Sequence, residues 1–315
     1  RYPAGGDGRG DDQKQVSIDY HRLGADQATD RHVYSITDHP TRNPGAEVTD
    51  DGRYLVISVF DGYASNGVYY LDLQKPEAGV VRLLDGWDAL YTFLGNRGSE
   101  FLFQTTAGAD RGRIVAIDLA RPEPSAWREI VPEQLETLEG ASYIGGHLIS
   151  RYLRDASALV RVHRPDGSLR NSVALPGPGT AAGFTGSATA SETFFKFNSY
   201  LTPAALYRYD IAADKVEVFR QPKVAFDPSP YVTEQVFYTS KDGTRVPMFI
   251  TRRKDAKLDG RNPVLLYGYG GFSVALTPAY SVPVAVWLEM GGIYAVANLR
   301  GGGEYGEAWH EAGTK

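Results

Sequence analysis

Short apolar runs recur along residues 1–222 in two series that share one spacing. The first series comprises residues 68–73, 114–119, 159–164 and 206–211, and the second comprises residues 53–59, 100–105, 147–153 and 193–199. Within each series the runs follow one another at about 46 residues, which is the spacing of a structural repeat. Because the two series stay in step over four repeats, chance is a poor explanation of the pattern.

The period predicts a β-propeller, whose four-stranded blades each take about 40 to 50 residues. Aromatic segments such as Phe-Leu-Phe at 101–103 and Phe-Phe-Lys-Phe at 194–197 have the composition of strands, and the repeats are too polar for helical solenoids. We therefore expect four nearly complete blades over residues 40–222. Residues 1–39 would hold the end of an earlier blade, with a strand at residues 16–23.

The C-terminal part shows the pattern of a parallel strand, helix, strand unit. Residues 264–267 and 293–297 are apolar runs of the kind found in fully buried strands, and residues 282–290 form a helix candidate that ends at Gly291. The ligand site of such a unit lies beyond the carboxyl ends of its strands, where residues 268–272 form a glycine-rich turn. This pattern is typical of the opening of an α/β-hydrolase sheet.

Two segments look like connections. Residues 176–191 are rich in Gly, Ala, Ser and Thr, and we expect a long loop between blades there. Pro228 and Pro230 would stiffen the lead into the second domain. We place the domain boundary after Pro222, with a partial propeller in residues 1–222 and the N-terminal part of a hydrolase domain in residues 223–315.

The turn at residues 268–272 carries the candidate chemistry. In α/β-hydrolases the loop after this strand supplies part of the oxyanion hole, because glycines let donors approach the reacting carbonyl. Tyr269 is the candidate donor, and one such donor is worth about 10² to 10³ in rate. The alternative is that Tyr267 and Tyr269 are packing aromatics in a glycine turn.

Several motifs resemble the prolyl oligopeptidase family of serine peptidases. They are Tyr-Gly-Tyr-Gly-Gly-Phe at 267–272, Ala-Asn-Leu-Arg-Gly-Gly-Gly-Glu-Tyr-Gly at 297–306 and Trp-His at 309–310. Residues 240–250 resemble the strand pair that introduces the hydrolase domain of the family, and residues 47–59 resemble one of its blades. The resemblance therefore runs along almost the whole chain.

The resemblance implies site residues and an activity. Tyr269 takes the oxyanion position, and Phe272 takes the position of an aromatic that lines the proline-accepting pocket. Residues that would support the loops of the site without doing chemistry are Gly270, Gly271, Asn298 and Arg300. The implied protein is a monomeric serine endopeptidase without a cofactor. It would hydrolyse short peptides on the carboxyl side of proline, with a seven-bladed propeller restricting access.

The chain itself lacks a recognisable nucleophile. No Gly-x-Ser-x-Gly occurs, and in α/β-hydrolases the order Ser, Asp, His follows the oxyanion loop, so we expect the triad after Lys315 and no activity from this chain alone. The remaining blades would lie before Arg1, so that the chain would be cut at both ends or processed. His310 is expected to be structural, because the catalytic histidine of the family lies far downstream.

Three other interpretations stay open at this point. Gly301-x-Gly303-x-x-Gly306 matches a dinucleotide fingerprint, although a tight turn onto a helix opened by Glu304 explains these glycines better. The chain could instead be a propeller module for peptide or protein interaction with a vestigial hydrolase tail. It could also belong to another propeller hydrolase, such as an acylaminoacyl or dipeptidyl peptidase.

The amino-acid composition argues against several kinds of partner and site. With 315 residues, 42% of them hydrophobic, the chain can build two cores, and no apolar run approaches the ~18 residues of a membrane span. A net charge of -5 without a basic stretch argues against nucleic acid as a partner. The absence of Cys excludes disulfides and thiolate zinc sites, and no metal-ligand pattern is apparent. We expect a cytoplasmic protein, with the periplasm as the alternative.

Overall fold

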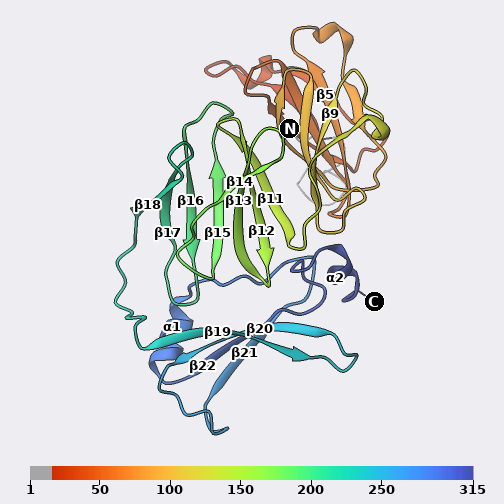
Figure 1. Cartoon of the computed structure of the whole chain (residues 1–315). Coiled ribbons are helices and arrows are strands. Elements are labelled where there is room, and N and C mark those ends of the chain that lie inside the picture. The colour runs from red at the N-terminus through yellow and green to blue at the C-terminus, as the bar shows by residue number, and fades with distance from the viewer. Residues whose placement is uncertain (1–15, 315) are drawn as a thin grey trace. The chain divides into compact units, whose positions relative to one another are not determined.

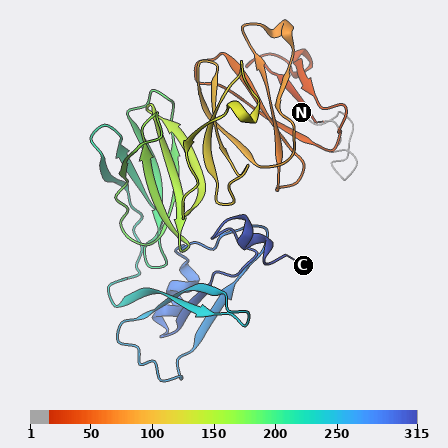
Figure 2. The same ribbon diagram turned by 45° about the vertical axis from the view of Figure 1, so that its right-hand side comes forward.

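The computed structural model describes residues 16–314, and the chain divides into two compact units. Of these residues, 16–108 and 114–129 belong to the first unit, and 109–113 and 130–314 belong to the second (Figures 1 and 2). No helix in residues 16–314 is long and apolar enough to cross a membrane.

The first unit holds a hairpin and two four-stranded sheets. The hairpin pairs β1 (Ser17–Tyr20) with β2 (Arg31–Ser35). The sheets contain β3 (Asn43–Val48), β4 (Tyr54–Phe60), β5 (Asn66–Asp72) and β6 (Val81–Leu84), then β7 (Tyr91–Arg97), β8 (Glu100–Thr105), β9 (Arg113–Asp118) and β10 (Arg128–Val131). Within the described residues, the connections contain three short 3-10 helices, η2 (Gln27–Thr29), η3 (Pro76–Ala78) and η4 (Pro124–Ala126). Within each sheet the strands follow sequence order, as in propeller blades.

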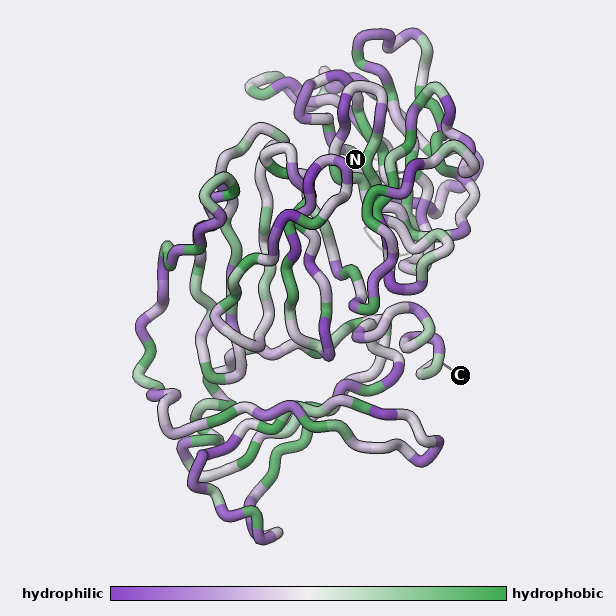
Figure 3. The backbone as a smooth tube through the Cα atoms, viewed as in Figure 1, coloured by the Kyte–Doolittle hydropathy of each residue, from purple (hydrophilic) through white to green (hydrophobic). Residues whose placement is uncertain are grey.

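Aromatic packing joins these two blades. The Tyr54 ring meets the Phe101 ring edge to face at 5.1 Å, and both side chains belong to one buried cluster. Asn66, which is 1% exposed, crosses from the first blade to the second: its Nδ2 donates to the carbonyl of Tyr91 at 3.0 Å, and its Oδ1 accepts from the amide of Tyr91 at 2.6 Å. Figure 3 shows hydrophobic segments along the strands and hydrophilic segments at many of the turns.

The second unit begins with two more blades. One contains β11 (Thr137–Ile144), β12 (His147–Arg154), β13 (Ser157–His163) and β14 (Leu169–Ser172), and the other contains β15 (Thr180–Thr185), β16 (Glu192–Asn198), β17 (Ala205–Asp210) and β18 (Lys215–Arg220). Their facing sides form one buried cluster in which Phe184 stacks on Phe195 with the ring centroids 4.7 Å apart. Blades of one unit thus bury each other's apolar faces.

The predicted repeat is confirmed. The second series of apolar runs corresponds to β4, β8, β12 and β16, and the first series corresponds to β5, β9, β13 and β17. These are the second and third strands of each blade. The predicted strand at residues 16–23 is the shorter β1, while residues 1–15 of the predicted earlier blade lie outside the described residues.

The prediction that residues 176–191 form a long loop is wrong, because β15 occupies the middle of this segment and pairs with β16. Small residues are needed here for packing. A methyl group on Gly179 would overlap the Phe197 ring. Ala181, which belongs to β15, is only 1% exposed. A composition typical of flexible linkers therefore belongs here to a strand whose glycine and alanine residues pack closely against its neighbour.

A mixed sheet follows the blades. It contains β19 (Tyr231–Thr239), β20 (Arg245–Arg253), β21 (Val264–Gly268) and β22 (Ile293–Ala297), in the order β19-β20-β22-β21. α1 (Val282–Glu289) connects the parallel pair β21 and β22, and α2 (Glu307–Glu311) follows. The predicted architecture, a partial propeller followed by the start of an α/β-hydrolase sheet, is present. The boundary predicted after Pro222 falls in the connection between β18 and β19 and stays a prediction.

β21 differs from the prediction of a fully buried strand. Val264, Leu265, Leu266 and Tyr267 are 46–64% exposed, because β21 is the last strand on its side of the described sheet. α1 buries Val284, Ala285 and Leu288, whereas Val286 is 48% exposed. β22, one strand further in, is buried as predicted.

The turn after β21 packs closely against the loop after β22. Gly270 has φ +68°, and a methyl group there would lie 2.7 Å from the carbonyl oxygen of Arg300 and 2.8 Å from the Cβ of Leu299. A methyl group on Gly271 would meet only the Tyr269 ring, at 3.7 Å. The first glycine is thus required by the backbone and the second is not.

The Gly270→Ala variant should unfold more easily than the wild type. Strain at positive φ costs about 1–3 kcal/mol, and the overlap with Arg300 and Leu299 adds to it. The matched control Gly271→Ala should change the free energy of unfolding by less than about 0.5 kcal/mol. Thermal and chemical denaturation of the three proteins measures both effects, and equal stabilities of the two variants would contradict the described turn.

His163 makes the third blade sensitive to acid. Its side chain is 4% exposed, with Nδ1 3.3 Å from Ser150 Oγ. Burial, helped by the Arg161 charge, lowers the pKa of His163 from 6.5 to about 4. The folded protein therefore holds a neutral imidazole at pH values where the unfolded chain would bind a proton.

Stability should consequently fall as the pH drops from 6.5 towards 4, by about 3 kcal/mol from this group. The contribution is fully present above pH 6.5. Urea denaturation between pH 7 and pH 4 measures the loss, with His163→Asn as the comparison because its side chain does not titrate. An identical pH slope in both proteins would show that His163 is not the responsible group.

Candidate active site

Tyr269 extends from the turn at the carboxyl end of β21. Its side chain is 48% exposed, and its hydroxyl makes no hydrogen bond to any residue in the part of the chain that the structure describes. The ring lies beside Gly271, where even an added methyl group would meet it only at 3.7 Å. A donor with an open hydroxyl at this end of a parallel strand is placed to meet an external acceptor.

Phe272 closes the same turn in a strained conformation. Phe272 and Ser273 have φ values of 54° and 56°, in the left-handed region that side chains with a Cβ seldom adopt. The Phe272 ring is nevertheless 68% exposed. Backbone strain that holds an exposed aromatic side chain is common at binding sites, where the surrounding structure maintains it.

Asn298 and Glu304 hold the segment that follows this turn. Asn298 is fully buried, and its Nδ2 donates to the carbonyl of Leu276 at 2.7 Å and to Glu304 Oε1 at 3.1 Å. The same Oε1 accepts from the amide of Leu276 at 3.0 Å. Both backbone groups of Leu276 are therefore fixed by two buried side chains. The Asn298 Oδ1 and the Glu304 Oε2 have no hydrogen-bond partner among the described residues.

Glu304 was missed as a site residue, and its predicted role is wrong. It does not open a helix, since α2 begins at Glu307 after an N-terminal cap at Gly306. It is instead a carboxylate that is 1% exposed. The available signal was a single acidic residue directly after three glycines in a sequence that follows a buried strand.

Unlike Asn298 and Glu304, Arg300 binds the turn between β19 and β20. Its guanidinium forms an ion pair with Asp242 and donates to Thr244 Oγ1 at 3.3 Å, both in the turn between β19 and β20. The amide of Thr244 and the Arg300 guanidinium hold the pKa of Asp242 well below its usual range. Arg300 thereby ties the loop after β22 to the first hairpin of the sheet.

The glycines after Arg300 serve close packing. Gly301 has φ +94°, and a methyl group on it would overlap the carbonyl of Gly270. The carbonyl of Gly301 accepts from the amide of Ser273 at 3.0 Å and lies 2.9 Å from His310 Nδ1. His310 is 7% exposed and acts here as a support for the loop. The dinucleotide interpretation is not needed to explain these residues.

Sequence comparisons match almost the whole chain to one family. The N-terminal β-propeller domain of prolyl oligopeptidase matches residues 3–222, and the prolyl oligopeptidase family domain matches residues 278–315. The prolyl endopeptidase of Elizabethkingia meningoseptica is 40% identical over 296 residues, which cover 94% of this chain and 42% of the relative. The prolyl oligopeptidase ophP of Omphalotus olearius is 34% identical, over 99% of this chain and 44% of the relative.

Solved structures give the same result. One from a study of two prolyl endopeptidases matches with a TM-score of 0.89 and 40% identity, covering 96% of this chain and 44% of that one. Prolyl oligopeptidase B from Galerina marginata, bound to a 25mer macrocyclization substrate, matches with a TM-score of 0.91 and 30% identity, covering 99% and 45%. The chain thus spans less than half the length of these relatives. By its propeller, its sheet and these matches, the chain belongs to the prolyl oligopeptidase family.

Proposed function

We propose that this chain supplies the propeller blades and the opening of the catalytic domain of a serine endopeptidase that hydrolyses short peptides on the carboxyl side of proline. The observation that carries the proposal is the turn after β21, where an open phenol at Tyr269 and an exposed aromatic ring at Phe272 extend from one strained backbone segment. Relatives named prolyl endopeptidase, at 40% identity, support it.

In the proposed reaction a serine attacks the carbonyl carbon of the proline residue, and a histidine takes the proton of the serine hydroxyl and passes it to the amine that leaves as the C–N bond breaks. Water then hydrolyses the acyl-enzyme. Tyr269 and a backbone N–H donate to the oxygen as negative charge develops on it. Phe272 offers an apolar face to the proline ring. The serine, its histidine and the acid would come from sequence beyond Lys315, because these 315 residues contain no Gly-x-Ser-x-Gly.

The edge of β21 supports a larger sheet. Parallel strands are normally covered on both faces, and open apolar edges favour aggregation. β21 exposes Val264, Leu266 and Tyr267. We infer that further strands and helices of the catalytic domain cover them.

We also propose that the propeller restricts access to the site. Thr137 and Thr180 are the first residues of β11 and β15, the first strands of their blades. Thr137 Oγ1 donates to the carbonyl of Glu304 at 3.2 Å, and Thr180 Oγ1 donates to the carbonyl of Pro278 at 2.7 Å. The loops around the site therefore lie against blade ends, where a folded protein would find little room. We propose further that the complete protein is a monomer and that it lies in the cytoplasm.

Tyr269→Phe should lower kcat of the intact protein by about 10² to 10³ and change KM much less, because the hydroxyl acts on charge that develops in the transition state. Hydrolysis of a Gly-Pro-arylamide measures both constants. The matched control is Tyr267→Phe, which removes a hydroxyl of equal exposure two residues away and should keep kcat within about two-fold. An unchanged kcat in Tyr269→Phe would remove this residue from the chemistry.

Fluorophosphonate labelling of the protein isolated from its source, followed by denatured intact mass, tests the reaction class. A labelled species well above 34.5 kDa is expected, because the probe needs an activated serine. An unlabelled species at 34.5 kDa would contradict the peptidase proposal and favour a propeller interaction module with a vestigial hydrolase tail.

A further inference from the structure

The tip of the β12–β13 hairpin is anchored in the hydrolase part of the second unit. Ala156 at this tip is fully buried and packs with Tyr200, Phe249 and Val296. Asp155 and Ala156 have φ values of 48° and 62°, a conformation in which glycine would be less strained. The buried methyl group of Ala156 gives a reason to keep alanine at this position.

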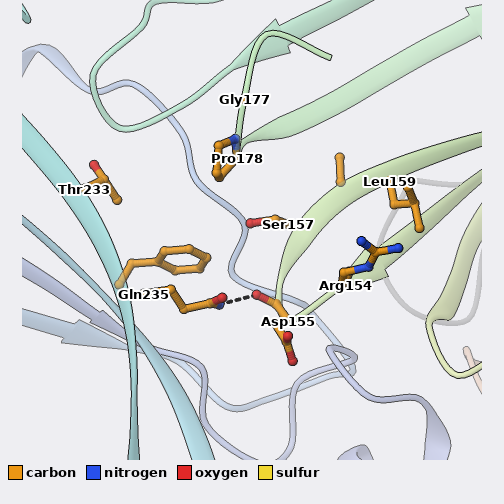
Figure 4. Close-up of a pocket in the computed structure, with 10 residues that line it drawn as sticks. Arg154, Asp155, Ser157, Leu159, Gly177, Pro178, Thr233 and Gln235 are labelled. Atoms are coloured by element: carbon orange, nitrogen blue, oxygen red, sulfur yellow. Dashed lines mark hydrogen bonds between the residues drawn. The ribbon is translucent and has the colours of Figure 1, made fainter. Parts of the chain in front are cut away.

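Asp155 adds two polar contacts to this anchor. Its backbone carbonyl accepts a hydrogen bond from Gln235 Nε2 on β19, and Figure 4 shows this contact. Its Oδ1 accepts from the hydroxyl of Tyr305 at 2.8 Å. Burial, together with the Asp155 carboxylate, raises the pKa of Tyr305, so the phenol keeps its proton and remains a donor.

Tyr305 directly follows Glu304, whose carboxylate binds the amide of Leu276. Its neighbour Glu304 is contacted from the propeller through its carbonyl, which accepts from Thr137 Oγ1 at 3.2 Å. The Glu304 side chain binds the amide of Leu276 on the opposite side. Glu304 and Tyr305 are therefore held by β11 and by the β12–β13 tip, and Glu304 in turn holds the backbone of Leu276.

The path from Leu276 to the site is short. Val274 donates its amide to the carbonyl of Gly271 at 3.0 Å, and Ser273 donates to the carbonyl of Gly301 at 3.0 Å. The first bond closes a turn over residues 271–274, which ends two residues before Leu276 and contains the strained backbone at Phe272. Tyr269 directly precedes Gly270 and this turn.

Open space lies on one side of the hairpin tip. A cavity of about 320 Å³ lies beside it, lined by residues that include Asp155, Ser157, Pro178, Thr233 and Gln235 (Figure 4). Without the hydrogen bonds from Gln235 and Tyr305, the tip would have space to move on this side. Tyr305→Phe would remove one of these polar contacts without changing a residue of the packed cluster around Ala156.

We propose that Glu304 and Tyr305 are positioning residues, through which the β12–β13 tip of the propeller holds the oxyanion donor Tyr269 in its working geometry. The inference rests on the proposed peptidase function. It assigns no chemistry to either residue. It predicts that loss of a propeller contact lowers catalysis at the oxyanion step rather than substrate binding.

The test is Tyr305→Phe in the intact protein, which removes only the hydroxyl that binds Asp155. We expect kcat for a Gly-Pro-arylamide to fall about ten-fold, with KM changed less than about two-fold. In a Tyr269→Phe background the same substitution should lower kcat less than about two-fold, because the donor that it positions is already gone. A full ten-fold loss in that background would overturn the proposal.

The control is Tyr209→Phe, which removes a tyrosine–aspartate bond away from the site, where the Tyr209 hydroxyl donates to Asp214 Oδ1 at 2.9 Å, together with the bond that this hydroxyl accepts from Asn171 Nδ2 at 3.1 Å. It should keep kcat within about two-fold. If Tyr305→Phe does not fold, Thr137→Val tests the same path from the propeller side. It removes the bond to the Glu304 carbonyl and should lower kcat about two- to three-fold with KM unchanged.

Hydrogen exchange separates this inference from the proposed function. The amide of Leu276 should exchange faster in Tyr305→Phe, Thr137→Val and Glu304→Gln than in the wild type, and at the wild-type rate in Tyr209→Phe. If the wild type hydrolyses no Gly-Pro-arylamide, the peptidase proposal fails and the exchange rates decide the positioning claim alone. Unchanged exchange at Leu276, or faster exchange with unchanged kcat in an active enzyme, would overturn the inference.

Discussion

A four-stranded blade has two faces and cannot bury either of them alone, and most of the described structure follows from this constraint. In the first unit, Tyr54 of one blade packs on Phe101 of the next, and in the second unit Phe184 stacks on Phe195 within a cluster shared by two blades. The apolar runs must therefore recur at the blade period. The same constraint places small residues in β15, where there is little space between the strands.

The candidate site depends on a second requirement, the close approach of two loops. Gly270 and Gly301 let the turn after β21 and the loop after β22 touch backbone to backbone. Asn298 and Glu304 then fix the two backbone groups of Leu276. The glycines make the contact sterically feasible, and the buried polar side chains give it one geometry.

Sequence reasoning predicted the parts of the structure that follow local rules. The blade strands and the crossover through α1 came from periodicity and from glycine stops, and the turn with Tyr269 and Phe272 came from its motif. The predicted roles of Tyr269, Phe272, Asn298 and Arg300 remain predictions. The wrong predictions concern residues whose local sequence pattern is compatible with two different structures. Gly and Ala at residues 176–191 indicated a linker but form a packed strand, and Glu304 had the position of a helix opener but is a buried anchor.

By itself, the sequence determined the repeat, the order of the elements and the residues that can carry chemistry, because these depend on spacing and on residue type. Only the tertiary structure decided which distant groups meet. Asp155 and Tyr305 are 150 positions apart, and Thr137 and Glu304 are 167 apart, so no local pattern could pair them. Likewise, the exposure of β21 follows from its place at the end of the described sheet. Burial depends on which residues lie nearby in space, and the packing of the blades and the sheet determines those neighbours.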